Sequence, residues 1–476
     1  MERTHDGGDL AAAPPDQDPG SGQHKLKTRH MTMIALGGTI GAGLFVGSSE
    51  VIHNTGPLTF VTYGLTGLLV VIVMRMISEM ATTSPLQGSF VDYARMALGG
   101  LAGFTTGWLY WYFWVIVVGF EAVVAGQLLD DWIPVPTWII AFVVLAVMTL
   151  VNLLSVRAFG ETEYWFAGIK AVAVVSFIVL ASLFVFGVWP GRSVDFSNFT
   201  AGGDVLPNGV FALFAGVAVV IFSMVGGEIV AIAAADSDDP KRSVRKAAST
   251  VAIRVLLFFV LSTLLLVVVV PWTSIKPGVS PFITALDGMG IPGASNILTL
   301  IILTAILSLL NSGLYTASRL TVDMAKNGDA PRWFAKTNNR GVSVRSILGC
   351  TAVGYGCVLM AALWPDTVFS FLINATGALM AFVYISIGIS QIRLRRRWES
   401  EGVDIPVKMW FFPWLSIVFV AALLGVLVAM WIQEGTRFPL LQGLVAVALL
   451  AVIYGLKTLV GRRRKSKMST ESPVAQ

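Results

Sequence analysis

The fold is decided by the glycine-rich stretch GGTIGAG, residues 37–43, which lies inside the first long apolar segment. Residues 31–52 are numerous enough to cross a bilayer, which takes about 20 residues of helix. Four glycines within seven positions disfavour a continuous helix, because each costs about 1 kcal/mol relative to alanine. Irregular backbone at membrane depth is tolerated only where protein buries it or where it lines a watery cavity. We therefore predict a broken helix whose second half begins near Gly41, with free N–H groups suited to a carboxylate.

The same glycines allow a second interpretation, which is helix packing. Gly37 with Gly41, and Gly43 with Gly47, have the GxxxG spacing that lets two helices approach closely. A nucleotide-binding loop is not indicated, because the chain has no GxxxxGKS/T motif and this stretch follows no predicted strand. The glycines alone leave ligand binding and helix packing both open.

The composition is that of a polytopic membrane protein. Of 476 residues, 55% are hydrophobic and only 13% are charged, which predicts an all-α protein of this class. We predict twelve transmembrane helices, at approximately 31–53, 57–77, 99–129, 135–155, 161–188, 207–235, 248–271, 294–325, 343–363, 366–391, 411–432 and 438–460. The net charge of +5 does not indicate a nucleic-acid partner, because the basic residues lie in short loops. Cys350 and Cys357 share one apolar segment and imply no disulfide framework.

Basic residues predict the orientation. Of the 33 lysines and arginines, 29 fall on the side of the termini, and cytoplasmic loops carry such an excess. We therefore predict that both termini are cytoplasmic. Residues 1–23 are expected to be a disordered tail, and residues 462–476 a basic tail whose RRRK run contacts anionic membrane lipids. No cleavable signal peptide is recognised, since the first residues are acidic and rich in proline and glycine.

A second interrupted helix is predicted at SMVGGE, residues 223–228, five spans after the first. Interruptions at corresponding positions of two halves are typical of inverted-repeat transporters. A repeat of five helices inverts the topology, so that the two interruptions face each other near the midplane. This predicts a first repeat over residues 24–188, a second over 189–398, and two peripheral spans over 399–461.

Three ionisable residues lie inside the predicted spans and are functional candidates. Glu228 follows the second interruption; it either takes part in proton coupling or hydrogen-bonds the unwound backbone of the first interruption. Glu121 either lines the pathway or pairs with a neighbouring polar group, since burying it unpaired is costly. Lys170 is a candidate proton carrier, because a lysine removed from water can lose its proton in the physiological range. Alternatively, Lys170 snorkels to the cytoplasmic headgroups.

Two further features are the aromatic residue Phe222 and the distribution of residues that catalysis needs. Phe222 precedes the second interruption, where its ring either caps a bound ligand or packs in the core, as most of the 28 phenylalanines do. Catalysis has little support, because a triad or metal site needs histidine, cysteine or clustered carboxylates and no histidine follows His53. We predict that the protein is not an enzyme and has no metal or cofactor.

Several motifs resemble one known family. Residues 29–47, RHMTMIALGGTIGAGLFVG, look like the opening signature of the bacterial amino acid permeases in the amino acid–polyamine–organocation superfamily. Glu79-Met80, followed by Pro85 and GSFxxYA at 88–94, matches a second family motif. GEIVAIAAA at 227–235 with DDP at 238–240 matches a third, although Asp236 replaces the usual glutamate. The resemblance covers about residues 24–456.

Within that family the sequence is most similar to 4-aminobutyrate (GABA) permeases. The segments that carry this likeness are GWLYWYFWVIV at 107–117, GExEYWF at 160–166 and LNSGLY at 310–315. The resemblance implies the leucine-transporter fold, a 5+5 inverted repeat with broken helices 1 and 6, a bacterial plasma (inner) membrane location, and proton-coupled uptake.

The resemblance also implies site residues. A substrate carboxylate would meet the amides at 41–43, and its amine the carbonyls near Ile40 and residues 222–225. The substrate-binding residues it predicts are Thr39, Ile40, Gly41, Ala42, Gly43, Phe222, Ser223, Val225 and Gly227. Lys170 aligns with the lysine that occupies the place of a second sodium ion in relatives, and Lys170, Glu121 and Glu228 are the proton-coupling candidates.

Three functions compete at this point. The first is import of GABA in symport with protons, and a variant of it is a permease for lysine, proline or an aromatic amino acid. The second is a channel or membrane scaffold without concentrative transport. The third, a membrane enzyme, is disfavoured by the distribution of histidine. Amino acid, protons and membrane lipids are therefore the expected partners.

Overall fold

The computed structural model describes residues 39–84, 90–154, 156–189, 193–200, 203–229, 240–338 and 342–470. All regular elements in these ranges are helical. The longer helices are α3 (Ser48–Thr55), α4 (Thr59–Thr83), α5 (Phe90–Leu98), α6 (Gly100–Leu128), α7 (Thr137–Leu154), α8 (Val156–Val185), α9 (Gly209–Met224), α11 (Pro240–Arg254), α12 (Ser262–Val269), α13 (Pro281–Gly288), α14 (Ala294–Lys326), α15 (Val344–Leu363), α16 (Pro365–Ser400), α17 (Trp414–Ile432) and α18 (Glu434–Thr470). The short elements are α2 (Ala42–Phe45), η2 (Gly56–Leu58), η3 (Ser197–Phe199), the π-helical η5 (Val255–Leu261), η6 (Trp272–Ser274) and η7 (Arg332–Ala335).

Ten helices in the described residues are long and apolar enough to cross a membrane. The first of them extends over Ala42–Thr83 and joins the described end of the first predicted span to the second span, because α3, η2 and α4 follow one another directly. The predicted sixth span, 207–235, contains α9, whose 16 residues make it a shorter apolar helix. The difference between twelve predicted segments and ten long helices arises at these two places.

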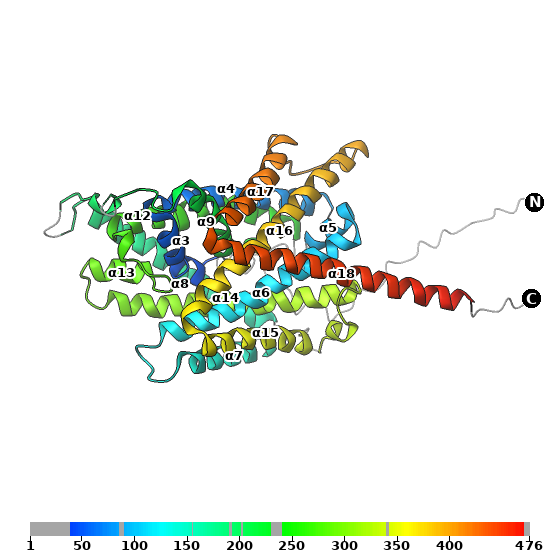
Figure 1. The fold of residues 1–476 in the computed structure, drawn as a ribbon, viewed down its shortest axis with the longest axis horizontal. Coiled ribbons are helices and arrows are strands. Elements are labelled where there is room, and N and C mark those ends of the chain that lie inside the picture. The colour runs from blue at the N-terminus through cyan, green and yellow to red at the C-terminus, as the bar shows by residue number, and fades with distance from the viewer. Residues whose placement is uncertain are drawn as a thin grey trace, which may run out of the picture.

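The bundle is built around α6. In the most apolar stretch of α6, 89% of the residues are buried. The helix packs against α14, α15, α16 and α7, as expected for a helix that is hydrophobic all round. The long helices run roughly along one direction, and α18 extends beyond the others at one end (Figure 1). In the most apolar stretch of α18 only 6% of the residues are buried, so this last helix lies at the outside of the bundle.

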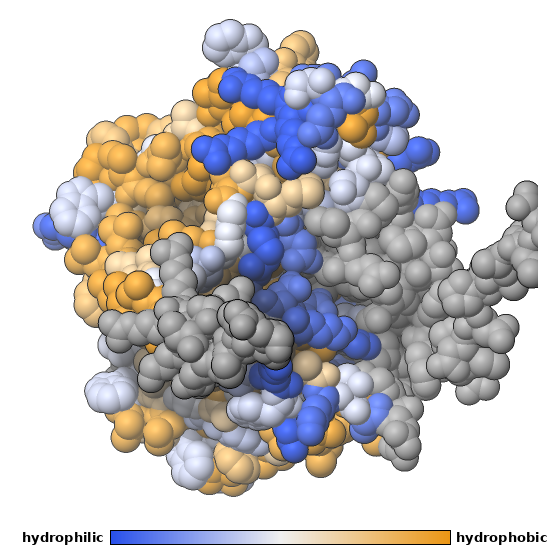
Figure 2. Space-filling view, turned by 90° about the vertical axis from the view of Figure 1, so that its right-hand side faces the viewer, coloured by the Kyte–Doolittle hydropathy of each residue, from blue (hydrophilic) through white to orange (hydrophobic). Residues whose placement is uncertain are grey.

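The surface divides into a hydrophilic end and an apolar flank. Figure 2 views the molecule from the end toward which α18 extends; hydrophilic side chains cross that face, and hydrophobic ones cover the flank to its left. Large apolar side chains are exposed along α7, α17 and α18, among them Leu150, Leu424 and Val445. Exposed apolar helix faces of this kind are those that lipid covers in a membrane protein.

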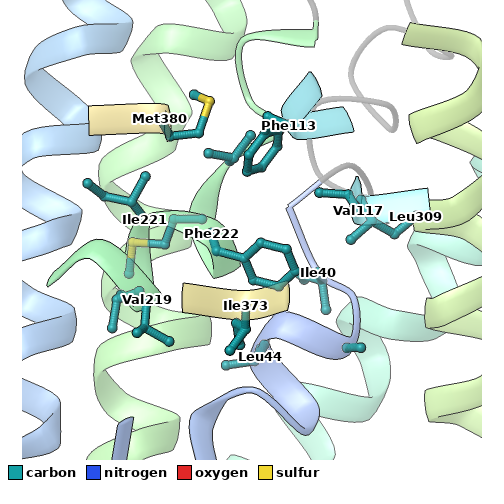
Figure 3. Close-up of a cluster of buried hydrophobic side chains, with 14 of the residues drawn as sticks. Ile40, Leu44, Phe113, Val117, Val219, Ile221, Phe222, Leu309, Ile373 and Met380 are labelled. Atoms are coloured by element: carbon teal, nitrogen blue, oxygen red, sulfur yellow. The ribbon is translucent and has the colours of Figure 1, made fainter. Parts of the chain in front are cut away.

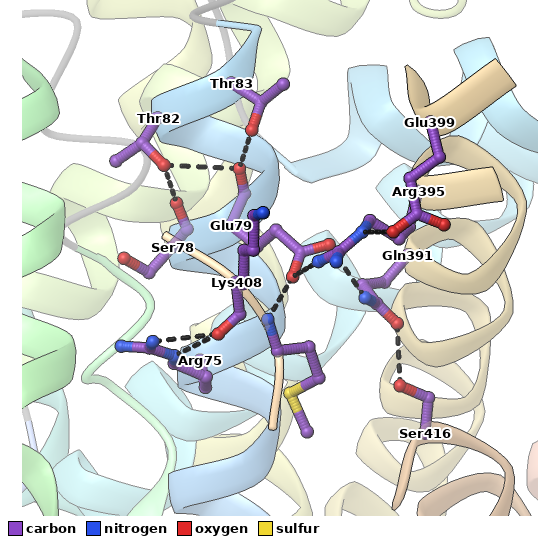
Figure 4. A network of polar contacts seen from close by, with 11 residues as sticks. Arg75, Ser78, Glu79, Thr82, Thr83, Gln391, Arg395, Glu399, Lys408 and Ser416 are labelled. Atoms are coloured by element: carbon purple, nitrogen blue, oxygen red, sulfur yellow. Dashed lines mark hydrogen bonds and ion pairs between the residues drawn. The ribbon is translucent and has the colours of Figure 1, made fainter. Parts of the chain in front are cut away.

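A buried polar network ties α4 to α16 and to the chain before α17 (Figure 4). Glu79 of α4 is fully buried and accepts from Gln391 Nε2 at 2.9 Å and from Arg395 Nη1 at 3.0 Å. The backbone N–H of Met409 also donates to Glu79, and Ser416 Oγ donates to Gln391 Oε1 at 2.8 Å. Removing one partner of a buried ion pair destabilises a protein by about 3–5 kcal/mol, so this network holds three segments together.

Candidate functional site

The chain lies outside helical geometry at Ile40 and Gly41, within the stretch predicted to interrupt the first span. Gly41 is extended, with φ −145° and ψ −155°, and α2 begins directly after it at Ala42. α2 therefore begins within one residue of Gly41, where the sequence predicts the start of a helix. Gly37 and Gly38, the first two glycines of the motif, lie outside the described residues.

The side chain of Glu121 meets the first amide of α2. The Ala42 N–H donates to both carboxylate oxygens of Glu121, each at 3.2 Å, and Glu121 is fully buried on α6. Free N–H groups and the dipole at a helix N-terminus favour an anion in this position. A carboxylate of the protein itself thus lies where the sequence predicts the carboxylate of a ligand.

Gly43 brings α2 against α9. A Cβ atom at position 43 would lie 2.8 Å from the Cα of Ser223 and 3.1 Å from Cε1 of Phe222. Ser223 Oγ donates to the carbonyl oxygen of Gly43 at 2.7 Å. A Cβ at Gly47 would also be tight, at 2.8 Å from Cδ1 of Ile373. The packing interpretation therefore holds for Gly43 and Gly47, whereas the amide of Ala42 faces a carboxylate.

The second interruption begins at Val225. α9 ends at Met224, Val225 is extended with φ −62° and ψ 142°, and Gly226 has a φ of 131° that glycine adopts readily. Helical geometry returns at Ile229, the last residue described in this segment. The interruption is thus three to four residues long in the described part of the chain, and it falls within the predicted stretch 223–228.

Glu228 binds its own segment. The Gly226 N–H donates to Glu228 Oε2 at 3.1 Å, and the side chain is buried. Tyr110 of α6 and Tyr384 of α16 interact electrostatically with it. Among the described residues the carboxylate that meets the first interruption is Glu121, whereas Glu228 bonds the backbone of the second; residues 37 and 38, the rest of the first interruption, lie outside the described residues.

Apolar side chains surround the two interruptions (Figure 3). The ring of Phe222 lies near Ile40, and its centroid is 4.9 Å from that of Phe120 and 6.1 Å from that of Phe113, both in edge contacts. Phe222 is therefore part of an aromatic cluster between α6 and α9. Edge-to-face pairs of this kind contribute about 0.5–1.5 kcal/mol each beyond buried area.

Lys170 lies in a fully buried polar cluster between α8 and α14. Its Nζ donates to Ser308 Oγ at 2.7 Å, and Ser308 Oγ lies 2.7 Å from each oxygen of Glu163. Lys170 Nζ and Glu163 Oε1 are 3.8 Å apart, and neither side chain is exposed. Lys170 also interacts electrostatically with Glu121. The snorkelling alternative is wrong, because the ammonium group is directed into the bundle and bound there.

Glu163 is a residue that our sequence reasoning did not single out. It precedes Lys170 by seven residues, which is close to two full turns and puts both side chains on one face of a helix. That spacing is the signal that could have found it. Its interhelical partner Ser308 lies 145 positions away along the chain, and no local pattern predicts that contact.

The structure brings most of the predicted site residues together, whereas one of them lies against α4. Ser223 and Gly43 join the two interruptions, Ala42 joins Glu121, and Glu121 interacts with Lys170. Thr39 is buried at the start of the described chain. Gly227 is the residue that lies against α4, since a Cβ atom at this position would lie 3.6 Å from Sδ of Met74, an ordinary contact distance.

A metal centre is not found among these side chains. Within the described residues no group of three or more His, Cys, Asp or Glu is placed to hold a metal ion. The ionisable side chains that the described residues bring together here are Lys170 and Glu163, 3.8 Å apart, and Glu121 at the Ala42 amide.

Comparison with known proteins identifies relatives over nearly the whole chain. The family described as "Amino acid permease" matches residues 30–466. The gamma-aminobutyric acid permease of Bacillus subtilis is 43% identical over 456 residues, 95% of this chain and 96% of that protein. The gamma-aminobutyric acid permease of Escherichia coli is 37% identical over 94% of this chain and 96% of its own length. The aromatic amino acid transport protein AroP of Corynebacterium glutamicum is 36% identical, covering 91% and 94%.

A solved transporter shares the fold. The crystal structure of the Eremococcus coleocola manganese transporter, in complex with an aromatic bis-isothiourea substituted compound, superposes with a TM-score of 0.56. The match covers 92% of this chain and 94% of that one at 13% identity. This likeness concerns the fold alone. The relatives in sequence are named as permeases, which are transporters and not enzymes.

Proposed function

The chain belongs to the amino acid permease family, and from this premise we propose that it imports GABA in symport with protons across the plasma membrane. Membership makes it a multi-pass membrane protein of amino acid transport. The choice of GABA is supported by the 43% and 37% identical relatives that are named for this substrate. The choice of protons is supported by the ionisable side chains buried beside both interruptions.

The proposed architecture is a leucine-transporter-like pair of inverted repeats, over residues 24–188 and 189–398, with twelve spans and broken helices 1 and 6. It is supported by the interruptions at Gly41 and Val225, which lie beside each other through the bond from Ser223 to Gly43. The proposed orientation in the membrane is supported by the basic residues, of which 29 of 33 fall on the side of the termini. Both termini, the tail 1–23 and the basic tail 462–476 are then cytoplasmic.

One observation carries the proposed mechanism: the carboxylate of Glu121 accepts the hydrogen bond of the Ala42 N–H group. A substrate carboxylate needs this same N–H group, and two negative charges about 4 Å apart repel by about 4 kcal/mol at an effective dielectric constant of 20. When Glu121 takes a proton from the outside, the repulsion disappears and the amide becomes available to the substrate. Loss of that proton to the cytoplasm restores the contact with Ala42 and expels the substrate, so that proton and substrate move together.

The amine end of the substrate is assigned to backbone carbonyl groups. The Val225 N–H donates an i to i−4 bond to the Ile221 carbonyl at 2.9 Å, and the pairing of α9 ends there because Val225 is extended. The carbonyls of residues 222–225 are then candidates for the ammonium group, together with that of Ile40. The residues Thr39, Gly41, Ala42, Gly43, Ser223 and Gly227 complete the proposed binding segments. The ring of Phe222, which packs edge-on against Phe120, is the proposed wall of the site on the side of α9.

Competition during counterflow tests the substrate. Purified protein in liposomes loaded with unlabelled GABA is expected to take up labelled GABA, because exchange needs no net proton movement. Unlabelled GABA and ω-amino acids of similar length should compete best, since they match both the amide and the carbonyl positions. Phenylalanine is the leading alternative, because the 36% identical relative is named as an aromatic amino acid transport protein. If phenylalanine, lysine or proline competes more strongly than GABA does, that amino acid and not GABA is the substrate. Protein-free liposomes provide the background.

A further inference from the structure

The contact between Lys170 and Glu163 passes through a hydroxyl group. Lys170 Nζ donates to Ser308 Oγ at 2.7 Å, and Ser308 Oγ donates to Glu163 at 2.7 Å. The direct distance from Nζ to Glu163 Oε1 is longer, at 3.8 Å. Both hydrogen bonds through Ser308 have the short length typical of bonds to charged groups, so the three side chains form one continuous donor chain.

This chain has a direction along α8. Glu163 lies seven residues before Lys170, about 10 Å nearer the start of the helix at 1.5 Å per residue. Beyond it, Asn311 lies three residues after Ser308 on α14 and accepts from Asn152 Nδ2 at 2.8 Å. Asn152 is two residues from the end of α7 at Leu154. The polar groups therefore continue from the level of Lys170 toward the end of the bundle that the basic residues mark as cytoplasmic.

Two carboxylates interact with Lys170 among the described residues: Glu163 from its own helix and Glu121 from α6. From α14, which also packs against α8, the group that faces Lys170 is the hydroxyl of Ser308. The segments α7, η5 and α12, which pack against α8 as well, contain no ionisable side chain in their sequences. Of these groups, Glu163 is the carboxylate that can accept a proton passed from Glu121 to Lys170.

We propose that Ser308 and Glu163 form the outlet for the transported proton, with Glu163 as the acceptor on the cytoplasmic side of Lys170. The proposal rests on proton symport and adds to it two residues and a route. In the step, a proton leaves Lys170 Nζ for Ser308 Oγ while the hydroxyl proton passes to a Glu163 oxygen. An ammonium–carboxylate pair becomes an amine and a carboxylic acid. Net charge is unchanged, so the step avoids creating an unpaired charge in the membrane interior.

Ser308→Ala tests the outlet without removing a charge. The variant keeps Lys170 and Glu163 within ion-pair distance but removes the bridging hydroxyl. We expect it to retain GABA counterflow and to lose accumulation driven by an imposed pH step, which at one proton per substrate reaches about tenfold per pH unit. Ser308→Thr restores a hydroxyl group and is expected to restore accumulation. Glu163→Gln, which fills the same space without a proton acceptor, should behave as Ser308→Ala does.

The matched control is Thr351→Val. Thr351 and Thr149 share a buried interhelical hydrogen bond of 3.1 Å between α15 and α7, remote from any carboxylate pair, and its loss should leave accumulation unchanged. Wild-type accumulation by Ser308→Ala, or equal loss in Ser308→Thr with counterflow retained, would overturn the outlet and leave Glu163 as a fixed counter-ion. Failure of the wild-type protein itself to accumulate substrate would instead overturn proton symport, and the outlet with it.

Discussion

Replacing Gly41 by leucine is expected to abolish substrate binding while folded protein remains in the membrane. A Cβ atom at this position would lie 2.9 Å from Oε1 of Glu121 and in contact with the tip of Leu309. The two nearest atoms are ends of flexible side chains that can move, and the third, Cβ of Leu309 at 3.0 Å, has to shift by only a few tenths of an ångström, so the bundle can accommodate the change. The leucine would then fill the space between Glu121 and the Ala42 amide, where the substrate carboxylate is proposed to lie.

Thermal unfolding of the purified variant measures this effect. GABA should raise the unfolding temperature of the wild-type protein, because a ligand that binds only the folded state stabilises it, and it should leave Gly41→Leu unchanged. Gly168→Leu on α8 is the matched control, since a Cβ there has no neighbour within 4 Å. Normal transport by Gly41→Leu would mean that the first interruption serves packing alone.

Gly43 is expected to respond differently. Its nearest neighbour is backbone, the Cα of Ser223 at 2.8 Å, and backbone cannot move aside without shifting α9 against α2. Loss of binding in a folded protein is therefore expected for Gly41, whereas a bulky residue at Gly43 should also reduce the yield of folded protein.

Lys170→Ala is expected to retain substrate exchange and to lose accumulation driven by a pH step. The variant removes the cation through which the proton passes between Glu121 and Glu163, but it leaves the Ala42 amide untouched. It also leaves Glu163 buried without its partner, a change that destabilises proteins by about 3–5 kcal/mol. The double variant Lys170→Ala with Glu163→Gln removes both charges, and it should be as uncoupled as the single variant and more stable.

The control for this variant is Lys326→Ala. Lys326 lies exposed near the end of α14, 3.9 Å from Asp323, and exposed pairs contribute little, so accumulation should be unchanged. If Lys170→Ala accumulates substrate as the wild-type protein does, the lysine is structural, and the proton would have to pass by way of Glu121 or Glu228 alone.

Local sequence pattern predicted the positions of the helices and of both interruptions because glycine acts on the backbone where it stands. A helix starts at Ala42, inside the stretch 37–43, and the stretch 223–228 contains the end of α9 at Met224. Hydrophobic length predicted the spans, and it differed from the structure where α3 runs on through η2 into α4, because this three-residue connection is itself helical.

Partners of the buried charges could not be predicted in the same way. Glu121 was recognised as a candidate from its depth, but its contact with Ala42 joins residues 79 positions apart. For Glu228 the sequence suggested the backbone of the first interruption as one bonding partner, whereas the bond described in the structure is with Gly226 of the second. Both unwound segments offer free amides, and the sequence does not say which one a carboxylate reaches. Glu163 was not predicted, although its spacing of seven residues from Lys170 is visible in the sequence, because each buried charge was considered singly and not as a member of a pair.

The most direct test of the account is GABA uptake by the purified wild-type protein in liposomes with an acidic exterior and the membrane potential held at zero. Coupling to one proton predicts accumulation up to about tenfold for each unit of pH difference, since one unit corresponds to about 1.4 kcal/mol. A protonophore should abolish the accumulation but not the exchange of internal for external GABA. Uptake that only equilibrates, or that is the same with and without the pH difference, would contradict proton-coupled import.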